Sequence, residues 1–362
     1  MRILFVTGSF PPQRCGVGDY AHHLIEALKK FSMCELGVLT SSPSVEGCGE
    51  KKYTINASME QWSFSEVGKF ILIVNSFKPD IIHFQYPTQG YGNKLLPCLL
   101  PFVGFLLRIK IVQTWHEIYG PRQMFRFFWM GIVPGGLIVV RPEYVKKLSR
   151  WLRWGLKNKV IRFIRNASSI PRASLSLDES KRLKENYLKG QKRLITFFGF
   201  IYPAKGVELL FDIADPLKDQ IIICGASPEM GEYQKSVYAK SNCSPWTGKV
   251  FITGELPRED VAKLLAVSDA VILPFKSGGG DWNTSIHGAQ AQGTFVITTS
   301  NSASGYDKLT NTYYASIDGV AEMKNALEKY CGSKNIEHGD IDAVWTSISN
   351  EHLDLYRLLV NK

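Results

Sequence analysis

Four loops in this 362-residue sequence carry residue types that bind anions or move protons. The first, residues 8–18, is rich in Gly and Pro, and Gly16 and Gly18 would let backbone N–H groups approach an anion where the next helix begins. A plain glycine turn explains the same loop, because the third glycine of a dinucleotide-binding fingerprint is missing. Asp19, which follows the loop, suits an N-cap better than a catalytic carboxylate.

Two histidines follow apolar runs. His83 stands in IIHFQYP, and His116 stands in VQTWHEIYG, where Glu117 comes next. A His-Glu pair just beyond an apolar strand is placed to act on a bound hydroxyl. A lone histidine more often makes a structural hydrogen bond, which is the interpretation favoured for His83, whereas a functional role is favoured for His116.

The other two loops could hold phosphate groups. Lys205 in FFGFIYPAKGVELL precedes Gly206 and an amphipathic helix, so its ammonium could reach a phosphate near the helix start, although a solvated surface lysine is the alternative. The loop PFKSGGGDWNTSIHG offers polar groups at a second helix start, where they could bind a diphosphate, cap the helix, or do both. The polar residues of that loop are Asp281, Asn283, Thr284 and Ser285.

Metal and cofactor signatures are missing. The sequence has no GxxxxGK[ST], HExxH or GxSxG motif. Its seven cysteines include no Cys-x-x-Cys pair, so they are interpreted as reduced thiols and not as a zinc site or disulfide set. We therefore expect neither a metal nor a cofactor.

Two sets of short apolar runs alternate with helical segments and must position these loops. The predicted strands are 3–7, 36–39, 81–84, 109–113 and 136–140, then 193–199, 220–225, 250–253, 270–274 and 294–298. The predicted helices are 19–31, 64–77, 95–107, 206–214, 258–267 and about 284–292. Apolar strands in alternation with helices indicate α/β domains with parallel sheets, whose ligands bind beyond the carboxyl ends of the strands.

The length of the chain is right for two cores of ordinary size. We predict a first domain of residues 1–190 and a second of residues 191–342, with the Ser-, Lys- and Arg-rich segment 166–193 at the junction. The last helix, 343–362, could pack back onto the first domain. With 45% hydrophobic and 21% charged residues, the composition excludes collagen-like, disulfide-framework and largely disordered classes.

The net charge of +10 is concentrated in one place. Residues 141–165 contain nine Lys and Arg residues against one acid, Glu143, and are interleaved with Trp151, Trp154 and aliphatic residues. This mixture is typical of a membrane-surface element, although a solvated face is the alternative; no nucleic-acid motif accompanies it. Because no run reaches membrane-spanning length, we expect a cytoplasmic protein held at the inner face of the membrane.

Six segments, in order and spacing, resemble the GT-B glycosyltransferases of family 4. They are MRILFVTGSFPPQRCGVGDY, IIHFQYP, TWHEIYG, FFGFIYPAKGVELL, VFITGELPREDVAKLLAVSDAVILPF and GAQAQGTFVITT. The resemblance covers nearly the whole chain. It implies two Rossmann-like domains facing across a cleft, a nucleotide-sugar donor on the C-terminal domain, an acceptor on the N-terminal domain, no metal, and transfer with retention.

The resemblance also implies roles for the residues above. His116 matches the family's histidine near the transferred sugar, Lys205 the basic residue on the leaving diphosphate, and Gly16 and Gly18 the loop over that diphosphate. In this scheme Glu117 or Asp281 would orient hydroxyls. Asn283, Thr284 and Ser285 would add donor contacts, and the acceptor would meet Asp19, Gln85 and Tyr86.

The sequence departs from the family at two carboxylates and one cation. The family's Glu-x7-Glu positions fall on Gly280 and Gly288, and its usual arginine falls on Phe200 or Ile201. These departures leave the donor open. The expected function is sugar transfer from a nucleotide diphosphate to a saccharide or lipid-linked acceptor, in bacterial-type surface polysaccharide, lipopolysaccharide or glycolipid synthesis. The alternatives are an inactive, glycosyltransferase-like binding subunit and a GT-B sugar-nucleotide epimerase.

Overall fold

The computed structural model describes residues 1–13, 15–41, 54–55, 59–117, 124–141, 143–225, 231–335 and 341–361. The chain divides into two compact units. Unit 1 consists of Met1–Asn166 and Asp342–Lys362, and unit 2 of Ala167–Ile341. The division therefore lies at residue 166, whereas the sequence analysis placed it near residue 190. The reason is that helix α7 (Leu177–Leu188), which begins at a Ser176 capping box, packs on helix α10 (Arg258–Val267) of unit 2.

Unit 1 is built on a seven-stranded sheet in the order β3-β2-β1-β4-β5-β6-β7, and all six pairings are parallel. Its strands are β1 (Arg2–Val6), β2 (Glu35–Leu39), β3 (Thr54–Ile55), β4 (Ile81–Tyr86), β5 (Lys110–Trp115), β6 (Gly135–Val139) and β7 (Lys159–Phe163). Every residue of β4 is buried. A central strand covered on both faces explains why its sequence reads as a continuous apolar run interrupted by only a few polar residues.

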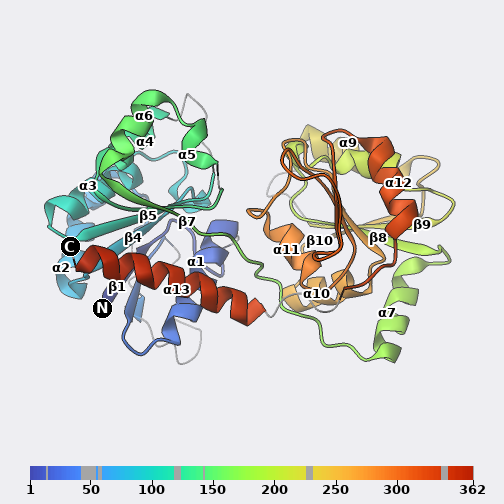
Figure 1. Cartoon of the computed structure of the whole chain (residues 1–362), viewed down its shortest axis with the longest axis horizontal. Coiled ribbons are helices and arrows are strands. Elements are labelled where there is room, and N and C mark those ends of the chain that lie inside the picture. The colour runs from blue at the N-terminus through green and yellow to red at the C-terminus, as the bar shows by residue number, and fades with distance from the viewer. Residues whose placement is uncertain are drawn as a thin grey trace. The chain divides into compact units, whose positions relative to one another are not determined.

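The helices of unit 1 are α1 (Gly16–Lys29), α2 (Val67–Phe77), α3 (Leu96–Leu106), α4 (Met124–Ile132), α5 (Tyr144–Lys147), α6 (Arg150–Gly155) and α13 (Ile341–Val360). Short 3-10 turns lie at Phe64–Glu66, Gln89–Tyr91 and Leu156–Asn158. Figure 1 shows α13 running beside α1, and the ring of Trp345 on α13 lies 5.4 Å from that of Tyr20 on α1. The described residues of the basic segment, from 143 to 165, include two short helices, α5 and α6, the turn Leu156–Asn158 and strand β7. No helix among the described residues is both long and apolar enough to span a membrane.

The first helix corrects one expectation. It begins at Gly16 with Cys15 in the N-cap position, so Asp19 lies inside the first turn and is not the N-cap. Cys15 provides no side-chain cap. An acidic residue in the first turn is nevertheless favourable, because it faces the positive end of the helix dipole.

Unit 2 has a second seven-stranded sheet in the order β10-β9-β8-β11-β12-β14-β13. Its strands are β8 (Arg193–Phe198), β9 (Asp219–Cys224), β10 (Val250–Gly254), β11 (Ala270–Leu273), β12 (Val296–Thr299), β13 (Gly305–Asp307) and β14 (Thr312–Ala315). The pairing of β13 with β14 is antiparallel, and the other five pairings are parallel. The sequence analysis did not predict β13 and β14.

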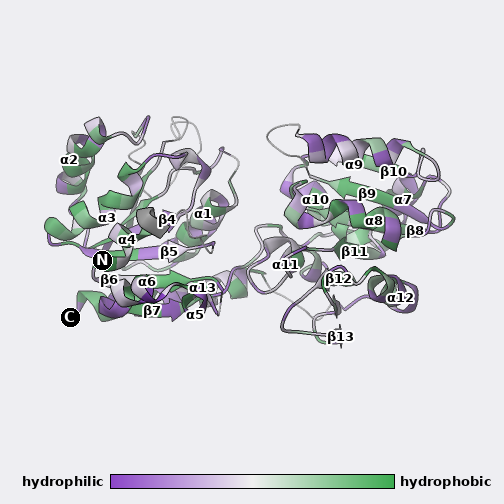
Figure 2. Ribbon diagram, turned by 90° about the horizontal axis from the view of Figure 1, so that it is seen from above, coloured by the Kyte–Doolittle hydropathy of each residue, from purple (hydrophilic) through white to green (hydrophobic). Residues whose placement is uncertain are grey.

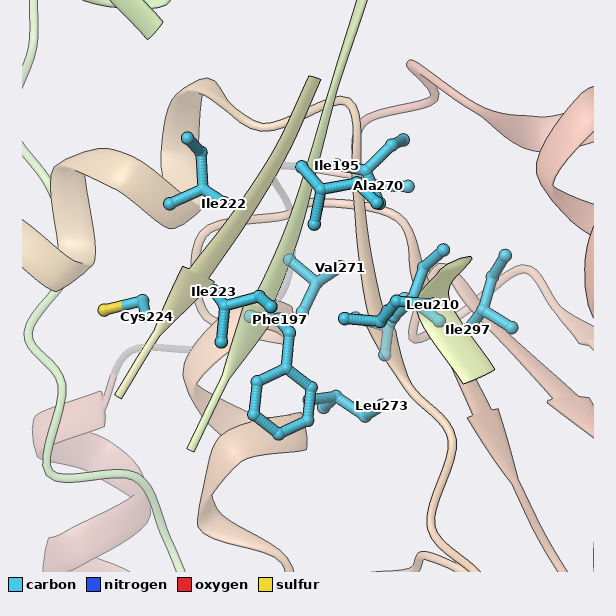
Figure 3. Close-up of a cluster of buried hydrophobic side chains, with 14 of the residues drawn as sticks. Ile195, Phe197, Leu210, Ile222, Ile223, Cys224, Ala270, Val271, Leu273 and Ile297 are labelled. Carbon is cyan, nitrogen blue, oxygen red and sulfur yellow. The ribbon is translucent and has the colours of Figure 1, made fainter. Parts of the chain in front are cut away.

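The remaining helices of unit 2 are α8 (Leu210–Ile213), α9 (Glu232–Asn242), α11 (Thr284–Gln290) and α12 (Val320–Tyr330), with 3-10 turns at Pro203–Lys205 and Val207–Leu209. Figure 3 shows how Ile195, Phe197 and Leu273 join in the core that the sheet and helices enclose. Figure 2 shows the contrast between the hydrophobic strand β9 and the largely hydrophilic helix α9. Burial of apolar strand residues at roughly 25 cal/mol per Å² is the main force that holds such a layered unit together.

Candidate active site

The parallel sheet of unit 1 gathers the predicted histidine loops at one edge. Strand β4 pairs with β1 on one side and with β5 on the other, so the loops that leave these three strands are neighbours. The register sets Gln85 opposite Thr114. Because side chains alternate along a strand, His83 and Gln85 share one face of the sheet with Thr114 and His116.

His116 is held from several directions. Its backbone N–H donates to the carbonyl of Tyr86 at 2.8 Å, and its Nε2 lies 2.9 Å from Oε1 of Gln85. The ring of Tyr20 meets the imidazole edge-on, with the centroids 4.8 Å apart. Burial, with a smaller contribution from His352, lowers the pKa of His116 to about 3. The imidazole is therefore neutral near pH 7 and acts there as a hydrogen-bonding group, not as a cation.

His83 is completely buried, as a structural role requires. Its Nδ1 lies 2.6 Å from the hydroxyl of Tyr356, and its Nε2 lies 2.7 Å from Oγ1 of Thr114 and 3.1 Å from Nε2 of Gln85. Burial, followed by the neighbouring His352 and His116, lowers its pKa well below the ordinary value. The sequence analysis had singled out neither Thr114 nor Tyr356, and only the polar character of Thr114 within an apolar strand could have signalled its part.

Gln85 and Tyr86 do not lie as acceptor contacts would. Gln85 is fully buried, and the buried hydroxyl of Tyr86 donates to the carbonyl of Pro97 at 2.6 Å. Their side chains serve the interior of unit 1, so the structure does not support direct contact between either side chain and an acceptor. Glu117, in contrast, is exposed, and its charge acts on the half-buried guanidinium of Arg141 at the end of β6.

The two glycines of the first loop differ in what surrounds them. A Cβ on Gly18 would lie 2.6 Å from the carbonyl oxygen of Ser9, so close packing of helix α1 on the loop requires glycine there. A Cβ on Gly16 would meet nothing within 4 Å, and this residue is exposed at the first turn of α1. Of the two, Gly16 is the one whose identity packing does not explain.

Unit 2 brings its two candidate loops together. Strands β8 and β11 are neighbours, and the N–H of Lys276, after β11, donates to the carbonyl of Ala204, after β8, at 3.1 Å. Gly206 has a φ of 65°, and a Cβ there would lie 2.2 Å from the carbonyl oxygen of Pro274. The ammonium of Lys205 lies over the ring of Phe275, 4.5 Å from its centroid. This contact ties Lys205 to the loop that leads to α11.

The loop before α11 is closed by its own hydrogen bonds. The N–H of Gly280 donates to Oδ1 of Asn283 at 3.0 Å, and the N–H of Asn283 donates to the carbonyl of Gly280 at 2.8 Å. Asn283 is the N-cap residue of α11, yet its side chain is used in this turn and caps no amide of the helix. Thr284 is exposed, whereas Ser285 is buried, with its hydroxyl 3.6 Å from where a Cβ on Gly199 would lie.

Asp281 is exposed in the same loop, and its carbonyl is 2.9 Å from Nε2 of His287.

The sequence analysis missed a second ammonium here, that of Lys276. It pairs with Glu208, which also accepts a hydrogen bond from the hydroxyl of Tyr233. The hydrogen bond between Lys276 and Glu208, together with the charge of Glu208, raises the pKa of Lys276. The position of Lys276, three residues after the end of the apolar strand β11, was the available signal.

Gly280 and Gly288 stand in different surroundings. A Cβ on Gly280 would lie 2.5 Å from the ring of Trp282, whereas a Cβ on Gly288 would lie 3.2 Å from Oγ of Ser168. The indole of Trp282 therefore fills the space into which a side chain at position 280 would project. Among the expected cation positions, Phe200 is partly exposed and Ile201 is buried.

Comparison with known proteins identifies the class. Residues 192–331 match the family described as glycosyl transferases group 1. No curated protein sequence matches the chain. Sucrose-phosphate synthase from Thermosynechococcus elongatus has a similar structure, with a TM-score of 0.72 at 17% identity over 99% of this chain and 98% of that one.

Two further structures agree in fold. HepE from Anabaena, in complex with UDP and glucose, superimposes with a TM-score of 0.69 at 14% identity, over 100% of this chain and 98% of HepE. WaaG, a glycosyltransferase involved in lipopolysaccharide biosynthesis, gives a TM-score of 0.60 at 12% identity, over 99% and 97% of the two chains.

Two parallel-sheet units, with polar loops beyond the carboxyl ends of their strands, give the chain the GT-B fold that these glycosyltransferases share. The match to the glycosyl transferases group 1 family lies within unit 2. The resemblance to the family 4-like GT-B enzymes noted in the sequence is thereby confirmed.

Proposed function

We propose that the protein transfers a sugar from a nucleoside-diphosphate donor to a saccharide or lipid-linked acceptor, with retention at the anomeric carbon and without a metal. The observation that carries the proposal is the placement of Lys205 in unit 2. Its ammonium lies over Phe275 and is tied to the loop that leads to α11. A cation held in this way is suited to the negative charge that develops on a leaving diphosphate.

Donor binding in unit 2 would use, besides Lys205, polar groups of the loop that leads to α11. The hydroxyls of Thr284 and Ser285 begin helix α11, and Asp281 precedes them in the loop. HepE, which has the same fold, was crystallised with UDP-glucose. A donor of this general kind, a sugar on a nucleoside diphosphate, fits the cation and hydroxyls of this loop.

Acceptor binding in unit 1 would use the edge where β1, β4 and β5 end. There His116 is neutral, Glu117 is exposed, and Asp19 lies in the first turn of α1. A neutral imidazole and a carboxylate can each accept a hydrogen bond from a sugar hydroxyl. The backbone at Gly16, which packing leaves open, would bind an anionic group such as a diphosphate.

We further propose that unit 1 binds the inner face of a membrane. Apolar side chains are exposed on three adjacent helices, at Leu106 of α3, Trp129 of α4 and Trp154 of α6, the last 61% exposed. Arg150 and Arg153 lie on α6 among them. Exposed tryptophans with neighbouring basic residues are suited to an anionic lipid surface. A cytoplasmic protein at this surface could reach a lipid-linked acceptor in polysaccharide, lipopolysaccharide or glycolipid synthesis.

Nucleotide binding provides the first test. Thermal unfolding of the whole chain is measured with UDP, GDP, dTDP and CMP and with their sugars. A ligand that binds the folded state raises the melting temperature, so one nucleotide and its sugar should stand out. That sugar nucleotide is then supplied with lipid-linked and free saccharide acceptors. Transfer supports the proposal, whereas turnover of the free sugar nucleotide to an epimer, or binding without turnover, contradicts it.

Vesicle binding provides the second test. The whole chain is sedimented with phosphatidylglycerol-containing vesicles and with neutral ones. Trp151→Ala with Trp154→Ala should lower binding to the anionic vesicles several-fold. Phe251→Ala, which removes an exposed aromatic side chain of unit 2, is the matched control and should bind like the wild type. Equal binding by the two variants would contradict the proposed surface.

A further inference from the structure

A chain of buried hydrogen bonds runs through unit 1 and ends at His116. It starts at the hydroxyl of Tyr356 on α13, passes through His83 and Gln85 on β4, and reaches Nε2 of His116 after β5. The successive distances are 2.6, 3.1 and 2.9 Å. Tyr356, His83 and Gln85 are completely buried, whereas 8% of His116 is exposed. Among these four hydrogen-bonded residues, His116 is therefore the one that solvent or a ligand can reach.

The side-chain amide of Gln85 fixes which atoms donate and which accept in this series of hydrogen bonds. Its amide has one accepting and one donating end, and the structure points Oε1 at His116 and Nε2 at His83. An acceptor at Oε1 requires His116 to be protonated at Nε2, which leaves the lone pair on Nδ1. A donor at Nε2 requires His83 to be unprotonated at Nε2 and protonated at Nδ1.

Tyr356 and Thr114 favour the same tautomer of His83, the one protonated at Nδ1. A protonated Nδ1 of His83 donates to the hydroxyl of Tyr356, and the hydroxyl of Thr114 donates to Nε2 of His83 beside the Gln85 amide. Burial keeps both histidines neutral near pH 7, so that each has a single ring proton to place. Helix α13 thus sets the state of a residue that belongs to another element.

We propose that Gln85 and Tyr356 are positioning residues, which act in series to hold His116 as its Nε2-protonated tautomer. The Nδ1 lone pair of His116 is then available to accept a hydrogen bond from a hydroxyl of a bound sugar. This use of Nδ1 rests on the proposed glycosyltransferase function, whereas the tautomer itself does not. Gln85 would act through His116 without touching the substrate.

The tautomer can be read directly. Long-range ¹H–¹⁵N correlation spectra of the whole chain, labelled with [¹⁵N]histidine and assigned with His116→Gln, distinguish a protonated Nε2 from a protonated Nδ1. Wild-type His116 should show the Nε2–H form, and Gln85→Met should show a mixture. Tyr356→Phe should change the tautomer of His83 most and that of His116 less. A wild-type His116 protonated at Nδ1, or an unchanged His116 in Gln85→Met, would overturn the proposal.

A conservative variant separates positioning from packing. Gln85→Glu keeps an acceptor for the Nε2–H of His116 and adds a negative charge, so it should preserve the tautomer and raise the pKa of His116. Loss of the Nε2–H tautomer in Gln85→Glu would count against the proposal, because a carboxylate oxygen replaces the amide oxygen as acceptor.

Kinetics complete the test. Gln85→Met should lower kcat by about tenfold, equivalent to roughly 1.4 kcal/mol, with the KM for the donor unchanged. The matched control is Gln113→Met. Gln113 is equally buried on the opposite face of β5, where it bonds Met130 and Trp115, so this variant loses a buried amide without touching the histidines. It should retain the wild-type kcat, and an equal loss in both variants would overturn the positioning role. A wild type without transferase activity would contradict the proposed function, while the spectra would still decide the tautomer.

Discussion

Nδ1 of His83 and the hydroxyl of Tyr356 lie 2.6 Å apart, although 273 residues separate them in the sequence. A second bond of the same kind joins Tyr20 of α1 to Nε2 of His352, one turn earlier on α13, at 3.3 Å. The last helix is therefore joined by buried polar contacts to the first helix and to the middle of the sheet. These contacts stabilise unit 1 only while the histidines are neutral.

Unit 1 should lose stability as the pH falls from 7 to 5. Burial lowers the pKa of His116 to about 3 and that of His352 to about 4, and it lowers the pKa of His83 as well. In the unfolded chain these groups titrate near 6.5, so below that pH the unfolded state binds more protons and acid favours unfolding. Each histidine contributes a slope of up to about 1.4 kcal/mol per pH unit.

Urea unfolding at pH 7, 6 and 5 measures this slope. The window lies above the range where carboxylates titrate, so the change reports the histidines. His352→Gln removes one titrating group and should flatten the dependence on pH. A wild type that is equally stable at pH 5 and pH 7 would disprove the burial of neutral histidines.

The two loop glycines should separate packing from ligand binding. Gly18→Ala places a Cβ 2.6 Å from the carbonyl oxygen of Ser9 and should destabilise the fold by about 1–3 kcal/mol. Gly16→Ala meets no atom within 4 Å, so its unfolding free energy should stay within about 0.5 kcal/mol of the wild type. If the backbone at Gly16 approaches the diphosphate, Gly16→Ala should still lower transfer. Full activity in that variant would remove Gly16 from the site.

Lys205→Ala should reduce turnover sharply while unit 2 stays folded. The variant removes an ammonium proposed to stabilise the leaving group, an effect of about 10²–10³-fold in kcat for a group of this kind. Lys329→Ala is the control. That lysine also lies over an aromatic ring, 5.1 Å from the centroid of Tyr330, but on the exposed side of α12. Thermal melts would verify folding, and an unchanged rate for Lys205→Ala would refute its assignment.

A buried ion pair should dominate the electrostatic stability of unit 2. Asp219 is fully buried and takes two bonds from Arg193, at 2.5 and 2.9 Å, and one from the N–H of Asp215 at 2.7 Å. Asp219→Ala leaves a half-buried guanidinium without this carboxylate and should cost about 3–5 kcal/mol. Glu328→Ala removes the exposed partner of the same arginine and should cost less than about 1 kcal/mol. Urea denaturation would show equal losses if this ranking were wrong.

Local sequence patterns were enough for much of the fold. The alternation of apolar runs and helical segments predicted most strands of both sheets, because buried parallel strands need apolar side chains on both faces. It did not predict β3 and β7 in unit 1. Nor did it predict β13 and β14 in unit 2, which are short and rich in polar residues and tyrosine. The start of α1 was also misplaced, because the helix begins at Gly16, three residues before Asp19.

The sequence by itself determined where the candidate loops lie, since His116, Lys205 and Asn283 each come after an apolar strand, and a local pattern shows where a strand ends. The tertiary structure alone decided how the side chains in those loops are used. Gln85 and Tyr86 point into unit 1, Trp282 fills the space beside Gly280, and Tyr356 reaches His83. Such contacts depend on strand register and on the packing of helices distant in sequence, and no periodicity within one segment encodes them.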